Sequence, residues 1–572
     1  MYSQLLLLLI GACVARAEVK VINSWNDGFQ ANINAPVTKS HNGWEMVLTF
    51  DRPLWKLEIW DADIIRSEQG GKVWHLKNKG HNAMKNPGES IAMTFVARGG
   101  ASSATVRIVG QDGGGTNTGT NPSKPVVDPV KPVTPTNTKY NYDDVLHKSI
   151  LFYEAQRSGK LPSNNRVPWR GDSALGDRGR NGEDLTGGWY DAGDHVKFGL
   201  PMGWSTMTLT WGLVDYKDAY VAAGEYNNML SSVKWPLDYF IKAHTSKNEL
   251  YVQVGDGYAD HGFWGRPEDM NMNRPAFKVT SGNPGSDVVG QTAGAMAAGY
   301  MAFKDSNAGY AATLLRHAKE LYDFGSRSQG IYTNQGGIPA KPFYVSQSYK
   351  DDLCVAAAWL YRATKEAKYL NDAKRWAETS PSWAYSWDDN KVSCQLLLYI
   401  ATKDNTYKSP IESYMRSWMR GGDVTYTPKG LAWRLQWGSL RYAANTAFIA
   451  LRAADAGINT NTYKNWAQGQ IHYMLGDTGR SYVVGFGNNP PTQPHHRAAS
   501  CPMRPAPCGS AQQNAWGPNP QVLNGALVGG PGSNDEYTDS RNDYIKNEVA
   551  TDYNAGFQSA IAGLKHWALQ KQ

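Results

Sequence analysis

The sequence has few features of a nucleic-acid-binding or membrane-embedded protein. It contains no lysine- or arginine-rich run, and its 58 basic and 51 acidic residues leave a net charge of only +7 over 572 residues. After the first residues, no apolar stretch is long enough to span a bilayer. We therefore expect neither nucleic acid nor a membrane among the partners of this chain.

Cysteine is also scarce, and one of the five cysteines lies in the N-terminal segment 1–17. In this segment an apolar run over residues 5–10 leads to Ala15-Arg16-Ala17, which fits an A-x-A cleavage site. The run is too short to cross a membrane. These features predict a signal peptide, a mature chain that begins near Glu18, and secretion to the extracellular space.

The four remaining cysteines allow three disulfide pairings in an oxidising compartment. Cys501 and Cys508 are close enough in sequence to close a small loop. Cys354 and Cys394 lie in segments with helical patterning and could join two helices. Free buried thiols remain the alternative, and none of the cysteine spacings resembles a zinc site.

Aromatic residues are abundant, with 21 Trp and 31 Tyr. Aromatic faces stack on the apolar faces of pyranose rings, so this excess favours a carbohydrate partner. Large helical cores also use tryptophan, and composition alone leaves both interpretations open.

A boundary is predicted at residues 111–139, where glycine, threonine, proline and asparagine dominate and apolar periodicity is absent. Such a stretch cannot bury a core, so we interpret it as an interdomain linker. A chain of this length is expected to form two or more domains. The predicted domains are residues 18–110 and residues 140–572.

The segment 18–110 has the pattern of an all-β domain. Short runs rich in β-branched and aromatic residues, such as EMVLTF (45–50) and ATVRIV (104–109), alternate with turn residues. About nine strands at this spacing predict a β-sandwich.

The segment after the linker changes to helical periodicity. Helical spacing of apolar residues occurs over residues 143–158, 232–243, 291–303, 311–324, 351–364, 393–402, 445–456, 463–475 and 556–569. Roughly a dozen helices with long Gly/Pro/aromatic loops favour a helical toroid whose loops carry a functional site.

Two segments combine carboxylates in a way that suits glycosidic cleavage. In WYDAGDHVKF (189–198), Asp191 and Asp194 flank a small Ala-Gly pair that permits a tight loop, and Glu548 precedes the start of a predicted helix. The reaction needs one protonated carboxyl to donate to the leaving oxygen, and one carboxylate to activate water or attack the sugar. Asp-x-x-Asp pairs are also common in loops and helix caps, so residue types alone leave the role open.

The same segments resemble the signatures of family 9 glycoside hydrolases. The matching motifs are FYEAQRSG (152–159), WYDAGDHVKF (189–198), WGRPE (264–268), WGSLRY (437–442), PHHR (494–497) and NEVA (547–550). They occur in the family's order and cover essentially the whole region after the linker. The resemblance implies an (α/α)6 barrel with an open cleft, and hydrolysis with inversion at the anomeric carbon. Inversion requires carboxyl groups roughly 6.5–9.5 Å apart.

The resemblance also implies roles for individual residues. Asp194 would be the general base on water, Asp191 would help to hold that water, and Glu548 would be the general acid. Asp539 matches a family active-site position, and His495 and Arg497 match residues that bind the sugar beside the scissile bond. Candidates for sugar stacking or hydrogen bonding are Trp264, Trp437, Tyr442, Tyr553, His261 and Arg266. Asp351 and Asp352 match an acidic pair that we interpret as structural or electrostatic support.

The chain departs from the family pattern at Gln291, where many relatives carry glutamate. The family often binds calcium near this region, so a structural calcium ion stays open, and no metal ligand is assigned. No cofactor is expected to be required. None of the departures touches Asp191, Asp194 or Glu548.

Residues 18–110 resemble family 2 carbohydrate-binding modules, in which a row of exposed aromatic side chains docks on cellulose. Trp25 and Trp60 match two of these positions, and the third falls near His81. Trp74 lies nearby on a predicted strand and is the remaining candidate, with core packing as the alternative. Trp44 and Trp55 are expected to be core residues.

Together these features predict a secreted, monomeric endo-β-1,4-glucanase that acts on cellulose. Processive or exo action, or activity on xylan or mixed-linkage glucan, stays open because cleft-end loops decide it. A lectin-like wall-binding protein with an inactive catalytic domain is the alternative from another class, and the intact Asp191, Asp194 and Glu548 argue against it.

Overall fold

The computed structural model describes residues 18–25, 28–87, 89–99, 103–109, 136–334 and 336–571. The chain divides into two compact units, Met1–Ser123 and Lys124–Gln572. The predicted signal peptide and residues 111–135 of the predicted linker lie outside the described residues. Within the described ranges, no helix has the length and apolar character that a membrane crossing requires.

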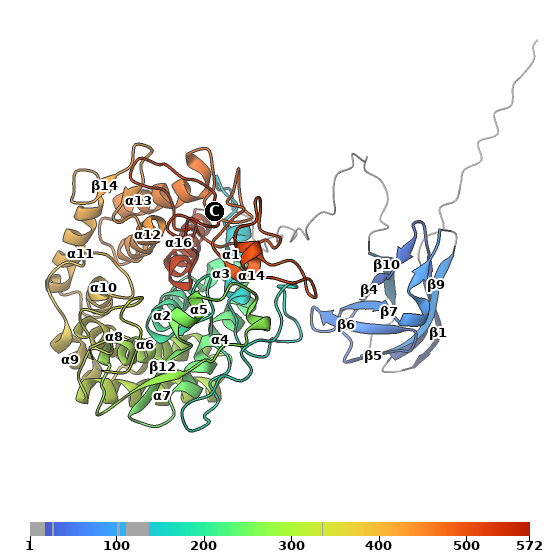
Figure 1. Ribbon diagram of the computed structural model, residues 1–572, viewed down its shortest axis with the longest axis horizontal. Coiled ribbons are helices and arrows are strands. Elements are labelled where there is room, and N and C mark those ends of the chain that lie inside the picture. The colour runs from blue at the N-terminus through green and yellow to red at the C-terminus, as the bar shows by residue number, and fades with distance from the viewer. Residues whose placement is uncertain are drawn as a thin grey trace, which may run out of the picture. The chain divides into compact units, whose positions relative to one another are not determined.

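The first unit is the expected β-sandwich, built from two four-stranded antiparallel sheets (Figure 1). One sheet has the order β1 (Glu18–Trp25), β2 (Gly28–Pro36), β9 (Ser90–Arg98) and β5 (Lys56–Ile59). The other has the order β10 (Ala104–Ile108), β4 (Glu45–Phe50), β7 (Val73–Asn78) and β6 (Ala62–Glu68). A short pair, β3 (His41–Asn42) and β8 (Met84–Lys85), completes the described strands.

Buried and exposed side chains alternate along the strands, and the buried ones fill the space between the two sheets. Along β2, buried Phe29, Ala31 and Ile33 alternate with more exposed residues, as expected for a strand with one face on the core. Phe29 packs against Phe50 of the opposite sheet and Phe95 of its own sheet, with ring centroids 6.2 and 5.8 Å away. The two sheets therefore share one apolar core.

The second unit is a double ring of helices, which confirms the predicted helical barrel (Figure 1). Each inner helix contacts the next until the ring closes. The inner helices are α2 (Gly199–Asp215), α6 (Ser286–Phe303), α8 (Lys350–Thr364), α10 (Lys391–Thr402), α12 (Ser439–Asp455) and α16 (Thr551–Leu569). The outer helices are α1 (Tyr142–Ala155), α4 (Tyr226–Ala243), α7 (Ala308–Arg327), α9 (Ala367–Trp376), α11 (Asn405–Trp418) and α13 (Thr460–His472).

Burial explains this arrangement. The inner helix α6 is buried on nearly all sides, whereas the outer helix α7 buries one face only. A helix that is apolar all round must lie inside, and an amphipathic helix can cover it. Helices α2, α9 and α11 had no matching prediction. Helix α2 contains three glycines. These glycines permit close helix contacts: a Cβ at Gly212 would lie 2.5 Å from the Ser559 hydroxyl of α16.

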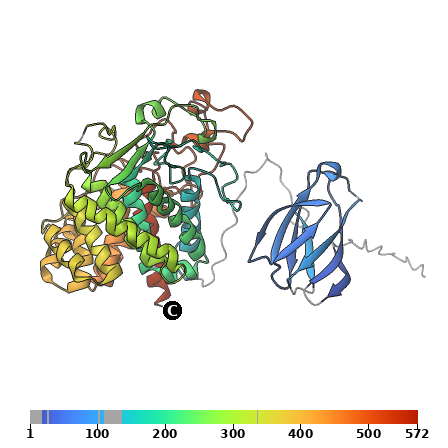
Figure 2. The same ribbon diagram turned by 90° about the horizontal axis from the view of Figure 1, so that it is seen from below.

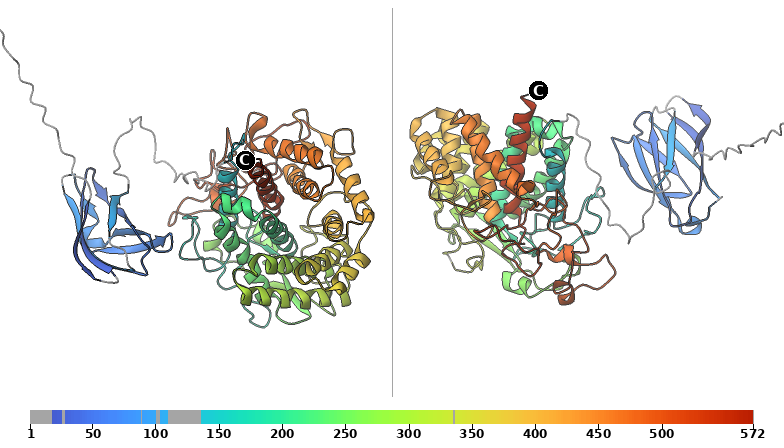
Figure 3. Two further views of the ribbon diagram at one scale, coloured as in Figure 1. Left: turned by 180° about the vertical axis from the view of Figure 1, so that it is seen from behind. Right: turned by 90° about the horizontal axis from the view of Figure 1, so that it is seen from above.

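The helices run side by side, and the long loops and short strands gather at one end of the barrel (Figures 2 and 3). The loop end carries β11 (Lys197–Phe198), β12 (Glu249–Val254), β13 (Ala276–Thr280), α5 (Gly257–His261), α14 (Arg497–Ser500) and α15 (Ser510–Gln513). The C-terminal end of α16 lies at the opposite end (Figure 2).

Both suggested disulfides form. Cys354–Cys394 joins the neighbouring inner helices α8 and α10, and Cys501–Cys508 closes a loop at a sequence separation of 7. The alternative of free buried thiols is therefore wrong.

Candidate active site

The loop end of the barrel holds a cleft of about 720 Å³. Its lining comes mainly from loops that precede inner helices, so residues far apart in sequence meet there. The lining residues are Asp191, Ala192, Asp194, Phe198, His261, Trp264, Pro342, Phe343, Tyr344, Trp387, Leu435, Trp437, Arg441, Tyr442, His495, Arg497, Gln513, Tyr544, Glu548, Ala550 and Tyr553.

The loop that carries the two aspartates is held against two other segments by backbone hydrogen bonds. The Arg497 amide donates to the Gly193 carbonyl at 3.1 Å, and the Thr551 amide donates to the Asp191 carbonyl at 2.8 Å. A Cβ at Gly193 would lie 2.1 Å from the His495 carbonyl oxygen, so this approach requires glycine. The Ala-Gly pair therefore allows the carboxylates to reach the cleft beside residues 495–497.

Glu548 is fixed by similar contacts just before α16. The segments of His495 and Glu548 pair as a short parallel bridge, in which the His495 amide donates to the Asn547 carbonyl at 2.8 Å. The Gly529 amide donates to the Glu548 carbonyl at 2.8 Å. The backbone of Glu548 is thus held on both sides, and its carboxyl group projects into the cleft.

Asp194 is arranged to keep its negative charge. Its Oδ1 accepts a hydrogen bond from the Ala192 amide at 3.0 Å, and its Oδ2 lies 3.6 Å from His261 Nε2. Burial alone would raise the pKa of this carboxyl group. The interactions with His261, Arg497 and the Ala192 amide outweigh burial and hold the pKa below its usual value. Asp194 is therefore ionised and can act as a base.

Asp191 has the opposite tendency. Burial, together with the negative charge of Asp194, raises its pKa well above the usual value. Tyr344 donates its hydroxyl hydrogen to Asp191 Oδ2, and Asp191 Oδ1 is buried without a protein partner. The pair therefore carries one negative charge, on Asp194, and Asp191 keeps an oxygen that can orient water.

Glu548 holds a proton at neutral pH. Burial and the nearby negative charge of Asp194 raise its pKa to about 8, against a smaller lowering by Arg497. A protonated carboxyl group and an ionised carboxylate thus line the same cleft. Acid/base cleavage of a glycosidic bond needs both groups: the protonated carboxyl group donates a proton, and the carboxylate accepts one.

His495 and Arg497 are oriented by buried partners. His495 Nδ1 donates to the Arg541 carbonyl at 2.7 Å, which leaves its Nε2 for a ligand, and burial lowers its pKa to about 4. Arg497 donates to Asp260 Oδ1 at 2.6 Å in a buried ion pair. A neutral imidazole and a fixed guanidinium therefore face the cleft, and both can hydrogen-bond sugar hydroxyl groups.

Aromatic rings form much of the remaining wall. Trp264 donates to the Ser500 hydroxyl at 2.9 Å and packs edge-on against His495, with ring centroids 5.3 Å apart. Trp437 is 46% exposed and lies beside Tyr544, which is 51% exposed. These two rings are open for stacking, whereas Tyr442 and Tyr553 are largely buried at the cleft floor.

Ten of the twelve predicted hydrolase-site residues line the cleft, and two do not. Arg266 is buried, and its guanidinium donates to the carbonyls of Pro502 and Ala506. Asp539 accepts hydrogen bonds from the backbone amides of Thr492 and Gln493. Arg266 thus holds the loop of the Cys501–Cys508 disulfide, and Asp539 holds the segment that leads to His495. A sugar contact of Arg266 and an active-site role of Asp539 stay predictions.

The predicted support residues Asp351 and Asp352 are buried in α8 and are absent from the cleft lining. Tyr344, Asp260 and Tyr544 contact predicted site residues and were not themselves predicted. Asp260 is adjacent to the predicted His261, and Tyr544 lies three residues before the motif 547–550, so each was close to a usable signal. Tyr344 lies in a loop without a motif, and only its contact with Asp191 identifies it.

The region around Gln291 bears on the calcium ion that the family implies. Calcium binds six to eight oxygen ligands. Here Gln291 donates its amide hydrogens to Asp352 and to the Trp387 carbonyl, and both oxygens of Asp287 accept from the Tyr332 amide. Burial raises the pKa of Asp287 to about 7. These carboxyl groups already have hydrogen-bond donors, so this set does not fit calcium.

The tryptophans of the first unit have different environments. Trp60 is 59% exposed, and Trp55 is 67% exposed, so the prediction of Trp55 as a core residue is wrong. Trp44 is buried as predicted. Trp74 is partly buried, packs on the core and donates to the Gly71 carbonyl at 2.7 Å, so it is corrected to a core residue. The side chains of Trp25 and His81 lie outside the described residues.

The double ring of helices and a cleft with two carboxyl groups of opposite protonation define the class of this protein, a glycoside hydrolase. Residues 142–561 match the model of glycosyl hydrolase family 9, and residues 15–114 match that of a cellulose binding domain. The chain belongs to glycosyl hydrolase family 9, and a cellulose binding domain precedes its hydrolase domain.

Similar proteins agree with this assignment. Endoglucanase A of Bacillus pumilus is 51% identical over 443 residues, which make up 74% of this chain and 66% of that protein. The chain thus spans about two thirds of the length of that relative. The endoglucanase structure from the termite Nasutitermes takasagoensis is 50% identical, with a TM-score of 0.74 over 75% of this chain and 100% of that chain. An endoglucanase from Clostridium thermocellum, solved with cellotriose, is 40% identical, with a TM-score of 0.67 over 75% of this chain and 71% of that chain.

Proposed function

We propose that this protein is a secreted endo-β-1,4-glucanase that hydrolyses internal bonds of cellulose with inversion. The observation that carries the proposal is the opposite displacement of two pKa values in one cleft: that of Glu548 is raised to about 8, and that of Asp194 is lowered. The names of the similar proteins support the glucanase class. The N-terminal segment 1–17 supports secretion, because it has the pattern of a signal peptide.

The proposed reaction is a single displacement. Asp194 takes a proton from water, which attacks the anomeric carbon, and Asp191 orients that water through its second oxygen. Glu548 gives its proton to the glycosidic oxygen as the bond breaks, so the leaving chain departs as a neutral alcohol. Both proton transfers use side chains of this chain, so the proposal requires no cofactor.

Substrate would lie along the aromatic wall of the cleft. Trp437 and Tyr544 present exposed ring faces on which glucose units can stack. His495 Nε2 and the Arg497 guanidinium can hydrogen-bond hydroxyl groups beside the scissile bond. The cellulose binding domain would hold the enzyme on its substrate through the exposed Trp60 and Trp55, raising the local substrate concentration.

Two measurements on the full-length chain test this function. Endo action predicts that the viscosity of carboxymethylcellulose falls much faster than reducing ends appear, whereas processive or exo action predicts the reverse. Inversion predicts that proton NMR first detects the α-anomer at the newly formed reducing end. An initial β-anomer would overturn the single-displacement mechanism, and absence of any glucan hydrolysis would overturn the enzyme function.

A further inference from the structure

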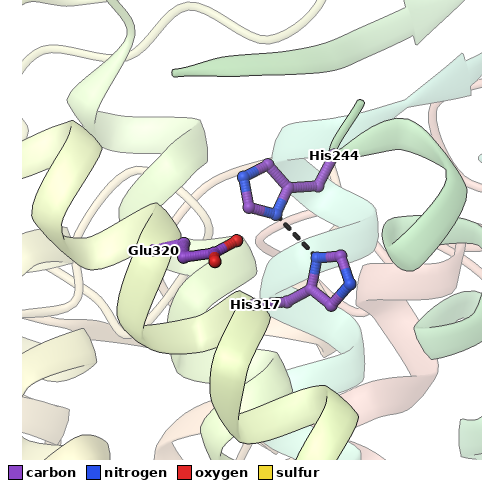
Figure 4. Close-up of side chains that lie close together, drawn as sticks. All are labelled: His244, His317 and Glu320. Atoms are coloured by element: carbon purple, nitrogen blue, oxygen red, sulfur yellow. Dashed lines mark hydrogen bonds between the residues drawn. The ribbon is translucent and has the colours of Figure 1, made fainter. Parts of the chain in front are cut away.

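Two histidines and a glutamate meet on the outer ring of the barrel, and none of them lines the cleft. His317 and Glu320 are three residues apart on α7 and therefore share one face of that helix. His244 follows the last residue of α4. Figure 4 shows the His244 ring facing His317, with the Glu320 carboxylate beside them. The Nδ1 atoms of the two imidazoles are 2.7 Å apart.

Hydrogen bonding fixes where the protons of the two imidazoles lie. Arg316 donates to His317 Nε2 at 2.9 Å, so His317 carries its proton on Nδ1. That proton is donated to His244 Nδ1, which places the His244 proton on Nε2. The backbone of Ser246 and Lys247 also hydrogen-bonds the His244 ring, which fits a proton on Nε2. The two Nδ1 atoms are therefore joined by one proton between α4 and α7.

Both imidazoles are in the protonation state that binds metals. His244 is 5% exposed and His317 is 6% exposed. The hydrogen bonds described above leave each imidazole with one proton, and metal ions bind this neutral form of histidine. Glu320 adds the negative charge that a divalent cation favours.

We propose that His244, His317 and Glu320 form a binding site for a divalent transition-metal ion, with Zn²⁺ as the ion to test. One ligand atom from each residue lies within 4.8 Å of the other two. Two imidazole nitrogens and one carboxylate are a ligand set that zinc accepts, with water as the fourth ligand. Ligand atoms of a tetrahedral zinc site lie about 3.3 Å apart, so the two rings need to separate by only about 0.6 Å.

Arg316 competes with the ion, because it contacts two of the three proposed ligand residues, His317 and Glu320. Zinc on His317 Nδ1 requires the His317 proton to move to Nε2, and that atom then no longer accepts a hydrogen bond from Arg316. Arg316 also forms an ion pair with Glu320 at 3.2 Å. The Arg316 side chain is 56% exposed, so it can move into water when the ion binds. The metal would tie the end of α4 to α7 and raise thermal stability.

The test is zinc titration of the untagged full-length chain by calorimetry, after treatment with a chelator. We expect His317→Ala to lose one equivalent of bound zinc, and Glu320→Gln to weaken that equivalent at least tenfold. Arg316→Ala should tighten binding, because it removes the competitor. Lys319→Ala is the matched control: Lys319 lies on α7 like Arg316, but its ammonium group pairs with Glu366 before α9 and donates to neither imidazole.

Thermal unfolding with and without zinc provides a second readout and should follow the same order among the variants. Asp194, Asp260 and His261 could also bind zinc, because one ligand atom from each lies within 4.8 Å of the other two. Zinc bound there would inhibit hydrolysis, so an activity assay distinguishes that site from the proposed one. The proposal is overturned if Glu320→Gln binds zinc as the unmodified chain does, or if Arg316→Ala binds it no tighter than Lys319→Ala.

Discussion

Replacement of Glu548 by glutamine tests the proposed acid most directly, because it removes the proton and keeps the shape of the side chain. With a pKa of about 8, about 99% of Glu548 is protonated at pH 6 and about 9% at pH 9. A positioned general acid contributes about 10²–10⁴-fold to the rate. This factor corresponds to about 2.7–5.4 kcal/mol of the barrier.

The assay is kcat/KM from pH 4 to 10 on carboxymethylcellulose and on an aryl cellobioside whose phenol leaves without protonation. We expect wild-type activity on cellulose to fall about tenfold between pH 7 and pH 9, since Glu548 loses its proton in this range. The Glu548→Gln variant should lose about 10²–10⁴-fold on cellulose and much less on the aryl substrate. The reasoning is refuted if a basic limb near pH 8 persists in the variant, or if its activity on cellulose is unchanged.

Glu548→Gln is expected to lower activity but to raise the stability of the folded chain. The unfolded Glu548 releases its proton near pH 4.5, whereas the folded chain retains it to about pH 8. The folded state therefore loses stability as the pH rises from about 4.5 to about 8. Thermal unfolding should show Glu548→Gln to be more stable than the wild type near pH 8, and this advantage should shrink toward pH 4.

Three further predictions concern the supports of the site and the binding domain. Gly193→Ala should lower both the melting temperature and kcat, because its Cβ would lie 2.1 Å from a carbonyl oxygen, whereas Gly176→Ala, which meets no atom within 4 Å, should leave both unchanged in the same assays. Tyr344→Phe should lower kcat about tenfold with little change in KM, because it removes a hydroxyl donor to the carboxyl group that orients water; an unchanged kcat would exclude that role. Trp55→Ala and Trp60→Ala should each weaken binding to insoluble cellulose by about 1 kcal/mol, measured by depletion from solution, and leave hydrolysis of soluble substrate unaffected.

Periodicity and motif order allowed most of the hydrolase domain to be predicted from the sequence. Helices such as α7 were found because one face of a surface helix is apolar and the other is polar, so apolar residues recur at the helical period in the sequence. Helix α2 is buried on nearly every side and contains several glycines, and it was missed, whereas the similarly buried α6 was found. The amphipathic helices α9 and α11 were also missed. The contacts that make the glycines of α2 necessary come from other helices.

Individual side chains show the same limit. Trp55 stands next to Leu54, which is buried, and the sequence offers no reason to separate them. Strand β5 begins only at Lys56, so strand alternation does not extend to Trp55, whose side chain is exposed. Arg266 matched a family motif, yet its direction is decided by carbonyls of Pro502 and Ala506, more than two hundred residues away.

The sequence by itself determined which residue types meet in the cleft: two aspartates on a tight Ala-Gly loop, and a glutamate before the last helix. It could not determine which carboxyl group holds a proton, since residue type gives all three similar pKa values. The tertiary structure decided this by placing His261 and Arg497 near Asp194, Tyr344 on Asp191, and burial and the charge of Asp194 around Glu548. Charge and burial act through space, and these neighbours come from segments far apart along the chain.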